Sequence, residues 1–144
     1  MSDVLTLSQI RMPGTARSKD DAIRETGEIL VDAGAVEPAY IDSMFDRERS
    51  VSTYMGNYLA IPHGTNESKE SIKRSALSVV RYTEPIDWDG NQVLFALGIA
   101  GYQGGHMDIL SRIAIVFSDT DEVDKLLAAQ TTQELYDLLT TVNQ

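Results

Sequence analysis

Cysteine is absent from this 144-residue sequence, and histidine occurs only twice. Without cysteine the chain can form no disulfide, offers no thiolate nucleophile and has no sulfur ligands for zinc. Two histidines are too few for a histidine-rich metal site, so we predict neither a metal ion nor a cofactor. Because other nucleophiles are few, the two histidines become the first candidates for chemistry.

Long apolar runs and excess positive charge are missing as well. The longest apolar run, residues 93–100, is interrupted by Gly98 and is too short to cross a bilayer. Asp3 and Ser8 interrupt the first apolar residues, so no leader pattern is present, and we expect a cytoplasmic protein without membrane insertion. The net charge of -10, without any cluster of Lys or Arg, argues against nucleic acid as a partner. This acidity is compatible with simple solubility or with steering toward a basic partner protein.

Strands and helices are interleaved along the whole chain. No repeat, low-complexity tract or linker divides it, so we predict a single domain over residues 1–144. Apolar and β-branched runs predict strands at residues 9–12, 58–61, 76–82 and 93–100. This order predicts an α/β sandwich with a mixed sheet.

The expected helices are marked in several cases by a capping residue at the start, or by glycine or basic residues near the end. They are a segment from the Ser18 cap to Gly34, a segment with Pro38 in its first position and Ser50 at its end, a helical turn within residues 66–74, the segment from His106 to Phe117, and two short helices opened by Asp119 with Glu122 and by Thr131 with Glu134. The helix from His106 is apolar on almost every side, so we expect most of it to be buried.

Both histidines follow predicted strands. His63 comes directly after residues 58–61, and His106 comes shortly after residues 93–100. Ligand sites of open α/β sheets gather at such strand ends. A neutral imidazole attacks phosphorus well near pH 7, because its pKa of about 6.5 leaves much of it unprotonated. The residues therefore favour phosphoryl transfer, although a solitary loop histidine is also a common surface residue.

Residues near the histidines offer the positive charge and N–H donors that a phosphoryl group needs. His106 follows Gly104 and Gly105 at a helix start, where backbone N–H groups favour an anion, but the two glycines also suit a plain connection. Arg47 or Arg49 is the candidate cation, and either one also complements the dipole at the end of its helix.

Other catalytic schemes lack their motifs. The sequence contains no G-x-S-x-G elbow and no G-x-x-x-x-G-K-[ST] loop, so a Ser-His-Asp hydrolase and a nucleotide site are disfavoured. Asp87 and Asp89 have the spacing of a carboxylate pair on a strand, but they suit a β-turn that ends at Gly90 better.

Two segments of the sequence resemble a known family. Residues 56–65 read GNYLAIPHGT, which is similar to the active-site motif of enzyme IIA domains of the bacterial sugar phosphotransferase system (PTS). Residues 97–110 read LGIAGYQGGHMDIL and resemble the second signature of that family. Thr65, Glu67 and Lys69 after the histidine are typical of its mannitol branch rather than its fructose branch. The opening helix and Val36-Glu37-Pro38 also fit, so the likeness covers nearly the whole chain.

The resemblance implies an α/β fold with a mixed central β-sheet flanked by helices on both faces, and a phosphotransferase that is phosphorylated on His63. It implies further that His63 accepts phosphate from the phosphocarrier protein HPr and passes it to the cysteine of an enzyme IIB or IICB, for mannitol uptake. By the same resemblance His106 is the second active-site histidine, Arg47 rather than Arg49 is the phosphate-stabilising arginine, and Gly64 and Thr65 are backbone donors to the phosphate.

One alternative function uses the same chemistry at His63. A regulatory module of the same family would take up phosphate and control a transcription regulator or a kinase instead of sugar uptake. The sequence leaves this alternative open, and it also leaves the sugar open, because an enzyme IIA domain contacts proteins and never the sugar.

Overall fold

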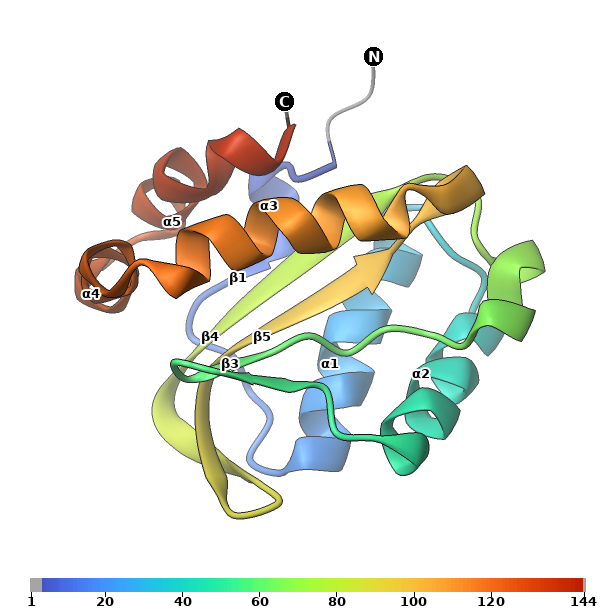
Figure 1. Cartoon of the computed structure of the whole chain (residues 1–144), viewed down its shortest axis with the longest axis horizontal. Coiled ribbons are helices and arrows are strands. Elements are labelled where there is room, and N and C mark those ends of the chain that lie inside the picture. The colour runs from blue at the N-terminus through green and yellow to red at the C-terminus, as the bar shows by residue number, and fades with distance from the viewer. Residues whose placement is uncertain (1–3, 144) are drawn as a thin grey trace.

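Five strands of a mixed sheet run through the centre of the molecule (Figure 1). The structure is a computed structural model, and it describes residues 4–143. The strands are β1 Ile10–Arg11, β2 Tyr54–Gly56, β3 Leu59–Ala60, β4 Ala76–Trp88 and β5 Asn91–Ala100. In the order β1-β4-β5-β3-β2, β4 is parallel to β1 and antiparallel to β5, and β3 is parallel to β5 and antiparallel to β2. The predicted mixed α/β sheet is confirmed.

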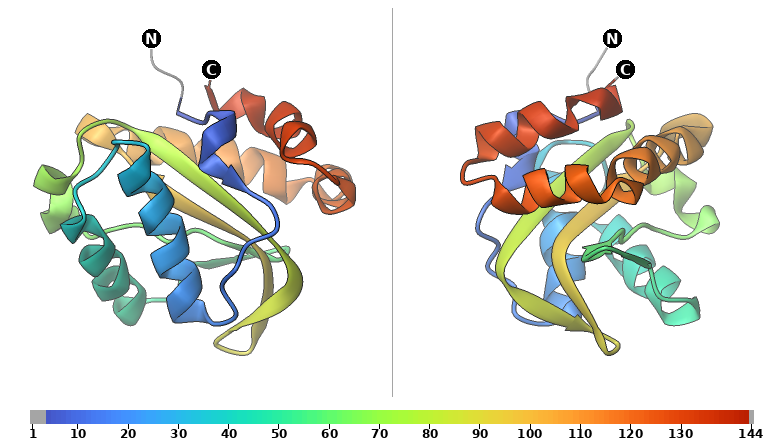
Figure 2. Two further views of the ribbon diagram at one scale, coloured as in Figure 1. Left: turned by 180° about the vertical axis from the view of Figure 1, so that it is seen from behind. Right: turned by 60° about the vertical axis from the view of Figure 1, so that its left-hand side comes forward.

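Helices cover both faces of this sheet (Figure 2). On one face lie α1 Lys19–Asp32 and α2 Ala39–Ser50, and on the other lie α3 His106–Ser118, α4 Thr120–Ala128 and α5 Thr132–Leu139. The structure also has short 3-10 turns: η1 Leu7–Gln9, η2 Asn66–Ser71, η3 Tyr102–Gly104 and η4 Thr140–Asn143. Neighbouring strand residues point to opposite faces, so Val79 packs with α3 to α5 while Val80 packs with α1 and α2. Of the helices within residues 4–143, none has the length and apolar character needed to span a bilayer.

The predicted helix caps are present. The Ser18 hydroxyl accepts a hydrogen bond from the Asp21 N–H at the start of α1, and Gly34 beyond its end has a φ of +77°. At the start of α5 the Thr131 hydroxyl accepts from the Glu134 N–H, and the Glu134 carboxylate accepts from the Gln130 N–H. Local hydrogen bonding of this kind can be read from a few adjacent residues.

Each predicted strand differs from the observed one by one or more residues at its ends, and two of these differences, at Tyr58 and at the end of β4, have a physical reason. Tyr58, predicted as the first residue of a strand, has a φ of +67°, and its carbonyl accepts from the N–H groups of Leu94 and Phe95. It lies in the turn that joins β2 to β3. Strand β2 has three residues and was not predicted from the sequence. In contrast, β4 continues six residues beyond the predicted end at Tyr82, because an irregularity between Arg81 and Ile86 accommodates Pro85.

Two helix predictions also need correction. Pro38 is the residue before α2 and not its first helical residue. In α3 only one face is buried, through Ile109, Ile113, Val116 and Phe117, while Ile115 is 71% exposed. The expectation that most of this helix is buried was therefore wrong, because the sheet and α4 cover only the face that they contact.

As predicted, a turn ends at Gly90: Asp89 and Gly90 form it between β4 and β5, and Asp87 lies near the end of β4, just before it. The Gly90 N–H donates to the Asp87 carboxylate, and the Asp89 carboxylate pairs with the Lys19 ammonium at 3.0 Å. Gly90 has a φ of +94°, which glycine adopts without strain. The turn lies at one end of β5, and Ile99 beside His63 lies near the other end, so these carboxylates take no part in a histidine site.

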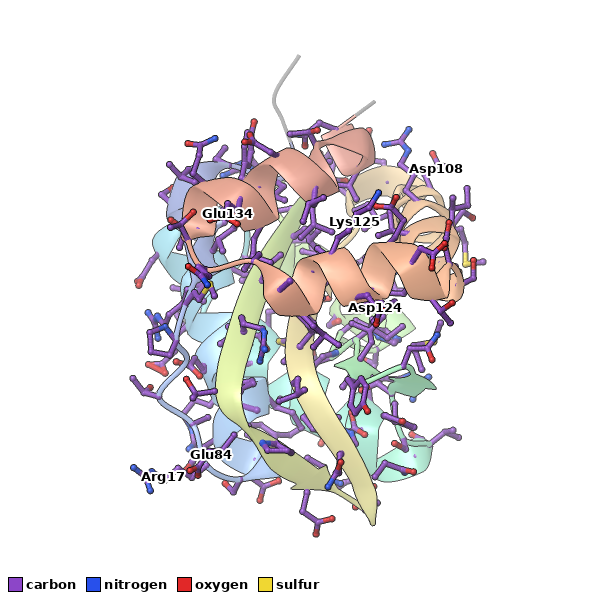
Figure 3. The ribbon with its side chains drawn as sticks, turned by 90° about the vertical axis from the view of Figure 1, so that its left-hand side faces the viewer. Arg17, Glu84, Asp108, Asp124, Lys125 and Glu134 are labelled. Atoms are coloured by element: carbon purple, nitrogen blue, oxygen red, sulfur yellow. The ribbon has the colours of Figure 1, made fainter. Side chains whose placement is uncertain are left out.

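Charged side chains project outward from the helices of the second face. Figure 3 shows Asp108 on α3, Asp124 and Lys125 on α4 and Glu134 on α5 at the surface, and all four are exposed. These side chains account for part of the net charge of -10 without entering the core.

Glu25 of α1 is a buried carboxylate that ties the N-terminal segment to the sheet. It is only 4% exposed and accepts hydrogen bonds from the Thr15 N–H and hydroxyl, the Ala16 N–H, the Arg11 guanidinium and the Tyr82 hydroxyl. Burial raises the pKa of Glu25, but the donors from Thr15, Arg11 and Tyr82 outweigh it, so the pKa lies below its ordinary 4.5.

We expect Glu25→Gln to lower the free energy of unfolding at pH 7 by about 2–3 kcal/mol, because it removes a buried charge with all its donors in place. The carboxylate contributes fully above the unfolded pKa, and its contribution is lost as the pH falls through the folded pKa. Urea unfolding at pH 7 and at pH 3 measures the effect, with Glu28→Gln on the exposed face of α1 as the matched control. Equal losses of unfolding free energy in Glu25→Gln and Glu28→Gln at pH 7 would contradict this prediction.

Candidate active site

The backbone of β5 holds His63 at the carboxyl end of β3. The chain runs from β3 through Ile61 and Pro62, and the Ile99 N–H donates to the Pro62 carbonyl at 3.0 Å. His63 itself forms a parallel bridge with Ile99 and is only 8% exposed. The histidine therefore has a fixed backbone and lies at the edge where two parallel strands end.

The orientation of the His63 ring follows from one hydrogen bond. Its Nδ1 lies 2.7 Å from the Ile61 carbonyl oxygen. A carbonyl only accepts, so Nδ1 carries the proton, and in the neutral ring Nε2 keeps its lone pair. The atom that is free to attack an electrophile is therefore Nε2.

His106 brings a second imidazole to the same place. It is the first residue of α3, and its ring centroid lies 4.8 Å from that of His63 at an interplanar angle of 50°. The preceding loop is held by the Tyr102 N–H, which donates to the Ser75 hydroxyl at 2.9 Å. Gly101 lies against the backbone of His106 so closely that a Cβ there would overlap it. This close approach places the two rings together.

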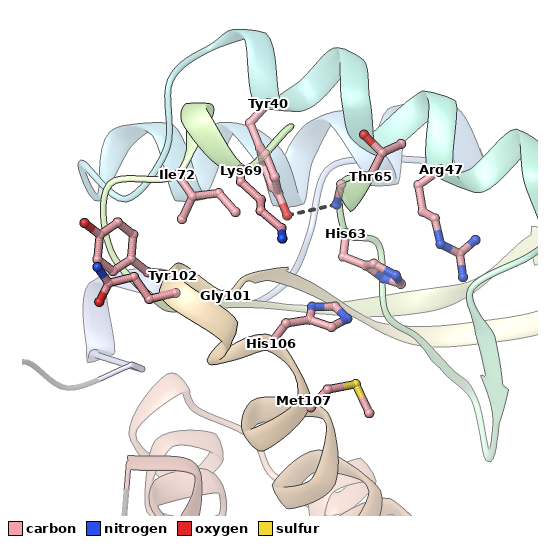
Figure 4. Close-up of a pocket in the computed structure, with 12 residues that line it drawn as sticks. Tyr40, Arg47, His63, Thr65, Lys69, Ile72, Gly101, Tyr102, His106 and Met107 are labelled. Carbon is pink, nitrogen blue, oxygen red and sulfur yellow. Dashed lines mark hydrogen bonds between the residues drawn. The ribbon is translucent and has the colours of Figure 1, made fainter. Parts of the chain in front are cut away.

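A cavity of about 470 Å³ opens between α2, the His63 segment and the start of α3 (Figure 4). Arg47 lines it, and its guanidinium donates to the Val51 carbonyl at 2.8 Å. Figure 4 shows Arg47 on one side of His63 and Lys69 on the other. Arg49 pairs with Asp46 on the exposed surface of α2 and is not among the lining residues. The lining residues are Tyr40, Arg47, His63, Gly64, Thr65, Lys69, Ile72, Gly101, Tyr102, Gln103, His106 and Met107.

Gly64 and Thr65, the predicted backbone donors, also line this cavity. The Gly64 N–H already donates to the Tyr40 hydroxyl at 2.8 Å, so it must leave that partner before it can bind a phosphate oxygen. Gly64 is also packed tightly, since a Cβ there would lie 2.5 Å from the Ser43 hydroxyl oxygen and from Tyr40 Cε1. The role of Gly64 and Thr65 as backbone donors to phosphate stays a prediction.

The charges in the cavity suit an anion. Two cations, Arg47 and Lys69, line it, and among the described lining residues there is no carboxylate. Among the side chains that the structure describes, no group of three or more His, Cys, Asp or Glu residues forms a set that would hold a metal ion. A buried nucleophilic nitrogen beside two cations can attack a phosphorus atom and hold the anionic group that results.

Comparison with known proteins places the chain in a family. The family model described as "Phosphoenolpyruvate-dependent sugar phosphotransferase system, EIIA 2" matches residues 3–142. The chain belongs to this family. The mannitol-specific phosphotransferase enzyme IIA component of Halalkalibacterium halodurans is 48% identical, with coverage of 98% of this chain and 97% of the relative. The component of the same name from Staphylococcus aureus is 45% identical, with 94% of each chain covered.

A solved structure of an EIIA protein has the same fold. Enzyme IIAMTL of Escherichia coli, determined in complex with phosphorylated enzyme IIBMTL, superposes with a TM-score of 0.89 at 28% identity, covering 95% of this chain and 97% of that one. The resemblance read from residues 56–65 and 97–110 is therefore confirmed at the level of the family. As a member of the EIIA family, the chain is a component of a phosphotransferase system.

Sequence reasoning assigned no role to Tyr40 in the EIIA site. It lies seven residues before Arg47 on α2, which is about two helical turns, so both side chains reach the same cavity. This spacing was the available signal, but the aromatic ring at that position reads equally well as part of the apolar stripe of the helix. Lys69 was noticed only as part of the family motif.

The environment of the EIIA site lowers the pKa of both histidines. Burial is the main cause at His63 and, together with the nearby His106 and Arg47, outweighs the Ile61 carbonyl and Glu48, bringing the pKa from 6.5 to about 4. Burial and then Arg47 also lower the pKa of His106. Both rings are thus neutral at pH 7, which leaves the Nε2 lone pair of His63 available.

We expect the His63 ring to stay neutral as the pH is lowered from 8 to 5 and to protonate near pH 4. The unfolded chain takes up this proton near pH 6.5, so the free energy of unfolding falls as the pH decreases through this window. ¹⁵N NMR of the imidazole, followed by pH titration, measures both the tautomer and the midpoint. A peptide of residues 58–68 is the control, and an equal midpoint in the protein and the peptide would contradict the expectation.

Proposed function

We propose that this EIIA protein accepts a phosphoryl group on Nε2 of His63 from phosphorylated HPr and passes it to the cysteine of a mannitol-type enzyme IIB or IICB. The observation that carries the proposal is the fixed His63 ring, whose Nδ1 is bound to Ile61 and whose Nε2 is free in a cavity lined by His106, Arg47 and Lys69. The mannitol assignment is supported by the names of the relatives, which are mannitol-specific.

The first transfer is a displacement at phosphorus. The Nε2 lone pair forms a bond to the phosphorus atom as the bond from phosphorus to HPr breaks, and HPr leaves with that electron pair. Positive charge then spreads over the imidazole, and the Ile61 carbonyl stabilises the proton on Nδ1. Arg47 is placed to neutralise the equatorial oxygens of the transferred group.

In the second transfer the enzyme IIB cysteine thiolate forms a bond to phosphorus, and the bond between phosphorus and Nε2 breaks. His63 recovers its lone pair and its neutral form, which the low pKa of the site favours. We assign to His106 the stabilisation of the phosphoryl group during this step, because its ring lies 4.8 Å from that of His63.

We further propose that residues 1–144 act as one EIIA type-2 domain in the cytoplasm. Support comes from the family match over residues 3–142 and from the single sheet that carries both cores. A cytoplasmic location follows from the proposed donor, because HPr must reach His63.

Reconstitution tests this function directly. The protein mixed with enzyme I, HPr and phosphoenolpyruvate is expected to gain one acid-labile phosphoryl group, seen by intact mass, and to transfer it to enzyme IIB for the phosphorylation of mannitol. Failure to gain phosphate would overturn the proposal. Phosphorylation of another hexitol but not of mannitol would change the sugar, and uptake of phosphate without transfer to any enzyme IIB would point to the regulatory alternative.

A further inference from the structure

Tyr40 is a buried tyrosine whose hydroxyl makes two hydrogen bonds beside His63. It lies in the first turn of α2 and is 2% exposed. The hydroxyl donates to the Ile99 carbonyl at 2.7 Å. It also accepts from the Gly64 N–H at 2.8 Å (Figure 4). One side chain of α2 therefore joins β5 to the residue that follows His63.

These bonds complete a frame around the histidine. On its N-terminal side, the Ile99 N–H donates to the Pro62 carbonyl at 3.0 Å. On its C-terminal side, Gly64 is connected to the carbonyl of the same Ile99 through the Tyr40 hydroxyl. The peptide units on both sides of His63 are thus anchored to one residue of β5, directly on one side and through Tyr40 on the other.

Packing reinforces the second anchor. A Cβ on Gly64 would lie 2.5 Å from Tyr40 Cε1, so the glycine lets the phenol ring lie directly on the backbone. Burial raises the pKa of Tyr40 to about 12 against the opposing effect of the Gly64 N–H, so the hydroxyl keeps its proton and remains a donor to Ile99.

We propose that Tyr40 is the positioning residue of this site: its hydroxyl clamps the Gly64 peptide to Ile99 and thereby fixes the direction in which Nε2 of His63 points. The inference rests on the proposed function of His63 and adds a residue that contacts no phosphate itself. The position of Nε2 matters for the rate of transfer, because a displacement of about 1 Å in a reacting group can lower the rate about 100-fold.

Tyr40→Phe tests the clamp, because it keeps the ring and removes only the hydroxyl. The matched control is Tyr82→Phe, which removes the hydroxyl of an equally buried tyrosine, 2% exposed, that donates to Glu25. Two measurements are compared with wild type: kcat and KM for phosphoryl uptake from phosphorylated HPr, and the ¹⁵N NMR tautomer signature of His63 without any phosphate donor.

The expected result for Tyr40→Phe is a loss of about 10- to 100-fold in kcat at little-changed KM. We also expect a His63 ring that samples both tautomers where wild type holds the proton on Nδ1. Tyr82→Phe is expected to change neither measurement, although both variants lower the stability.

A Tyr40→Phe protein with the wild-type tautomer signature and kcat would overturn the inference, and so would equal changes in the two phenylalanine variants. If wild type takes up no phosphate at all, the proposed function fails. The tautomer comparison needs no phosphate, so it still decides whether Tyr40 holds His63 in place.

Discussion

Replacing His63 by alanine is expected to abolish phosphorylation of this EIIA protein by enzyme I, HPr and phosphoenolpyruvate. The substitution removes the imidazole whose Nδ1 is bound to the Ile61 carbonyl and whose Nε2 is free in the cavity. Among the described residues, no other histidine has this arrangement. The measurement is the acid-labile phosphate per chain, by radiolabel or intact mass, with the fold checked by circular dichroism.

His106→Ala is the matched control for this experiment, because it removes the other histidine of the same cavity. We expect it to remain phosphorylated and to pass its phosphate to enzyme IIB more slowly than wild type. A His63→Ala protein labelled as strongly as wild type would refute the assignment of the nucleophile. Unchanged transfer from His106→Ala would refute the role given to the second ring.

Arg47→Gln is expected to lower kcat/KM for phosphoryl uptake by about 100-fold, the cost of removing one preorganised group that stabilises charge in a transition state. The guanidinium lines the cavity and acts on both histidines, since its charge lowers the pKa of each. Initial rates at several concentrations of phosphorylated HPr measure the change.

Arg49→Gln serves as the control for Arg47. It lies two residues later on α2, also in the last turn, and it is exposed and paired with Asp46. Both substitutions remove one charge from the same end of the helix, so an effect of the helix dipole would be shared by both. Similar losses of rate in the two variants would show that the charge acts on the helix and not on the phosphoryl group.

Several elements of the fold were predictable because their signals lie within a few adjacent residues. The Ser18 and Thr131 caps and the turn at Gly90 are local hydrogen-bond patterns. The continuous apolar run at residues 93–100 predicted a strand covered on both faces, and this segment forms most of β5. The sequence also excluded cysteine chemistry at once, because the residue is absent.

Other elements depended on contacts between distant segments. Strand β2 has three residues and no alternating pattern, and its existence depends on pairing with β3. The exposed face of α3 was misjudged, because hydropathy cannot tell which side of an apolar helix the sheet will cover. The choice between Arg47 and Arg49 rested on family resemblance alone until the cavity included one and not the other.

For the site itself, the sequence determined the chemistry that is available: two histidines, no cysteine, a glycine after His63 and two arginines at one helix end. Tertiary structure decided the rest. It set the 4.8 Å between the rings, the low pKa of His63 and the clamp from Tyr40 to Ile99. The physical reason is that burial and hydrogen-bond partners come from residues 24 to 59 positions apart in the chain, as at Tyr40, and no local pattern encodes them.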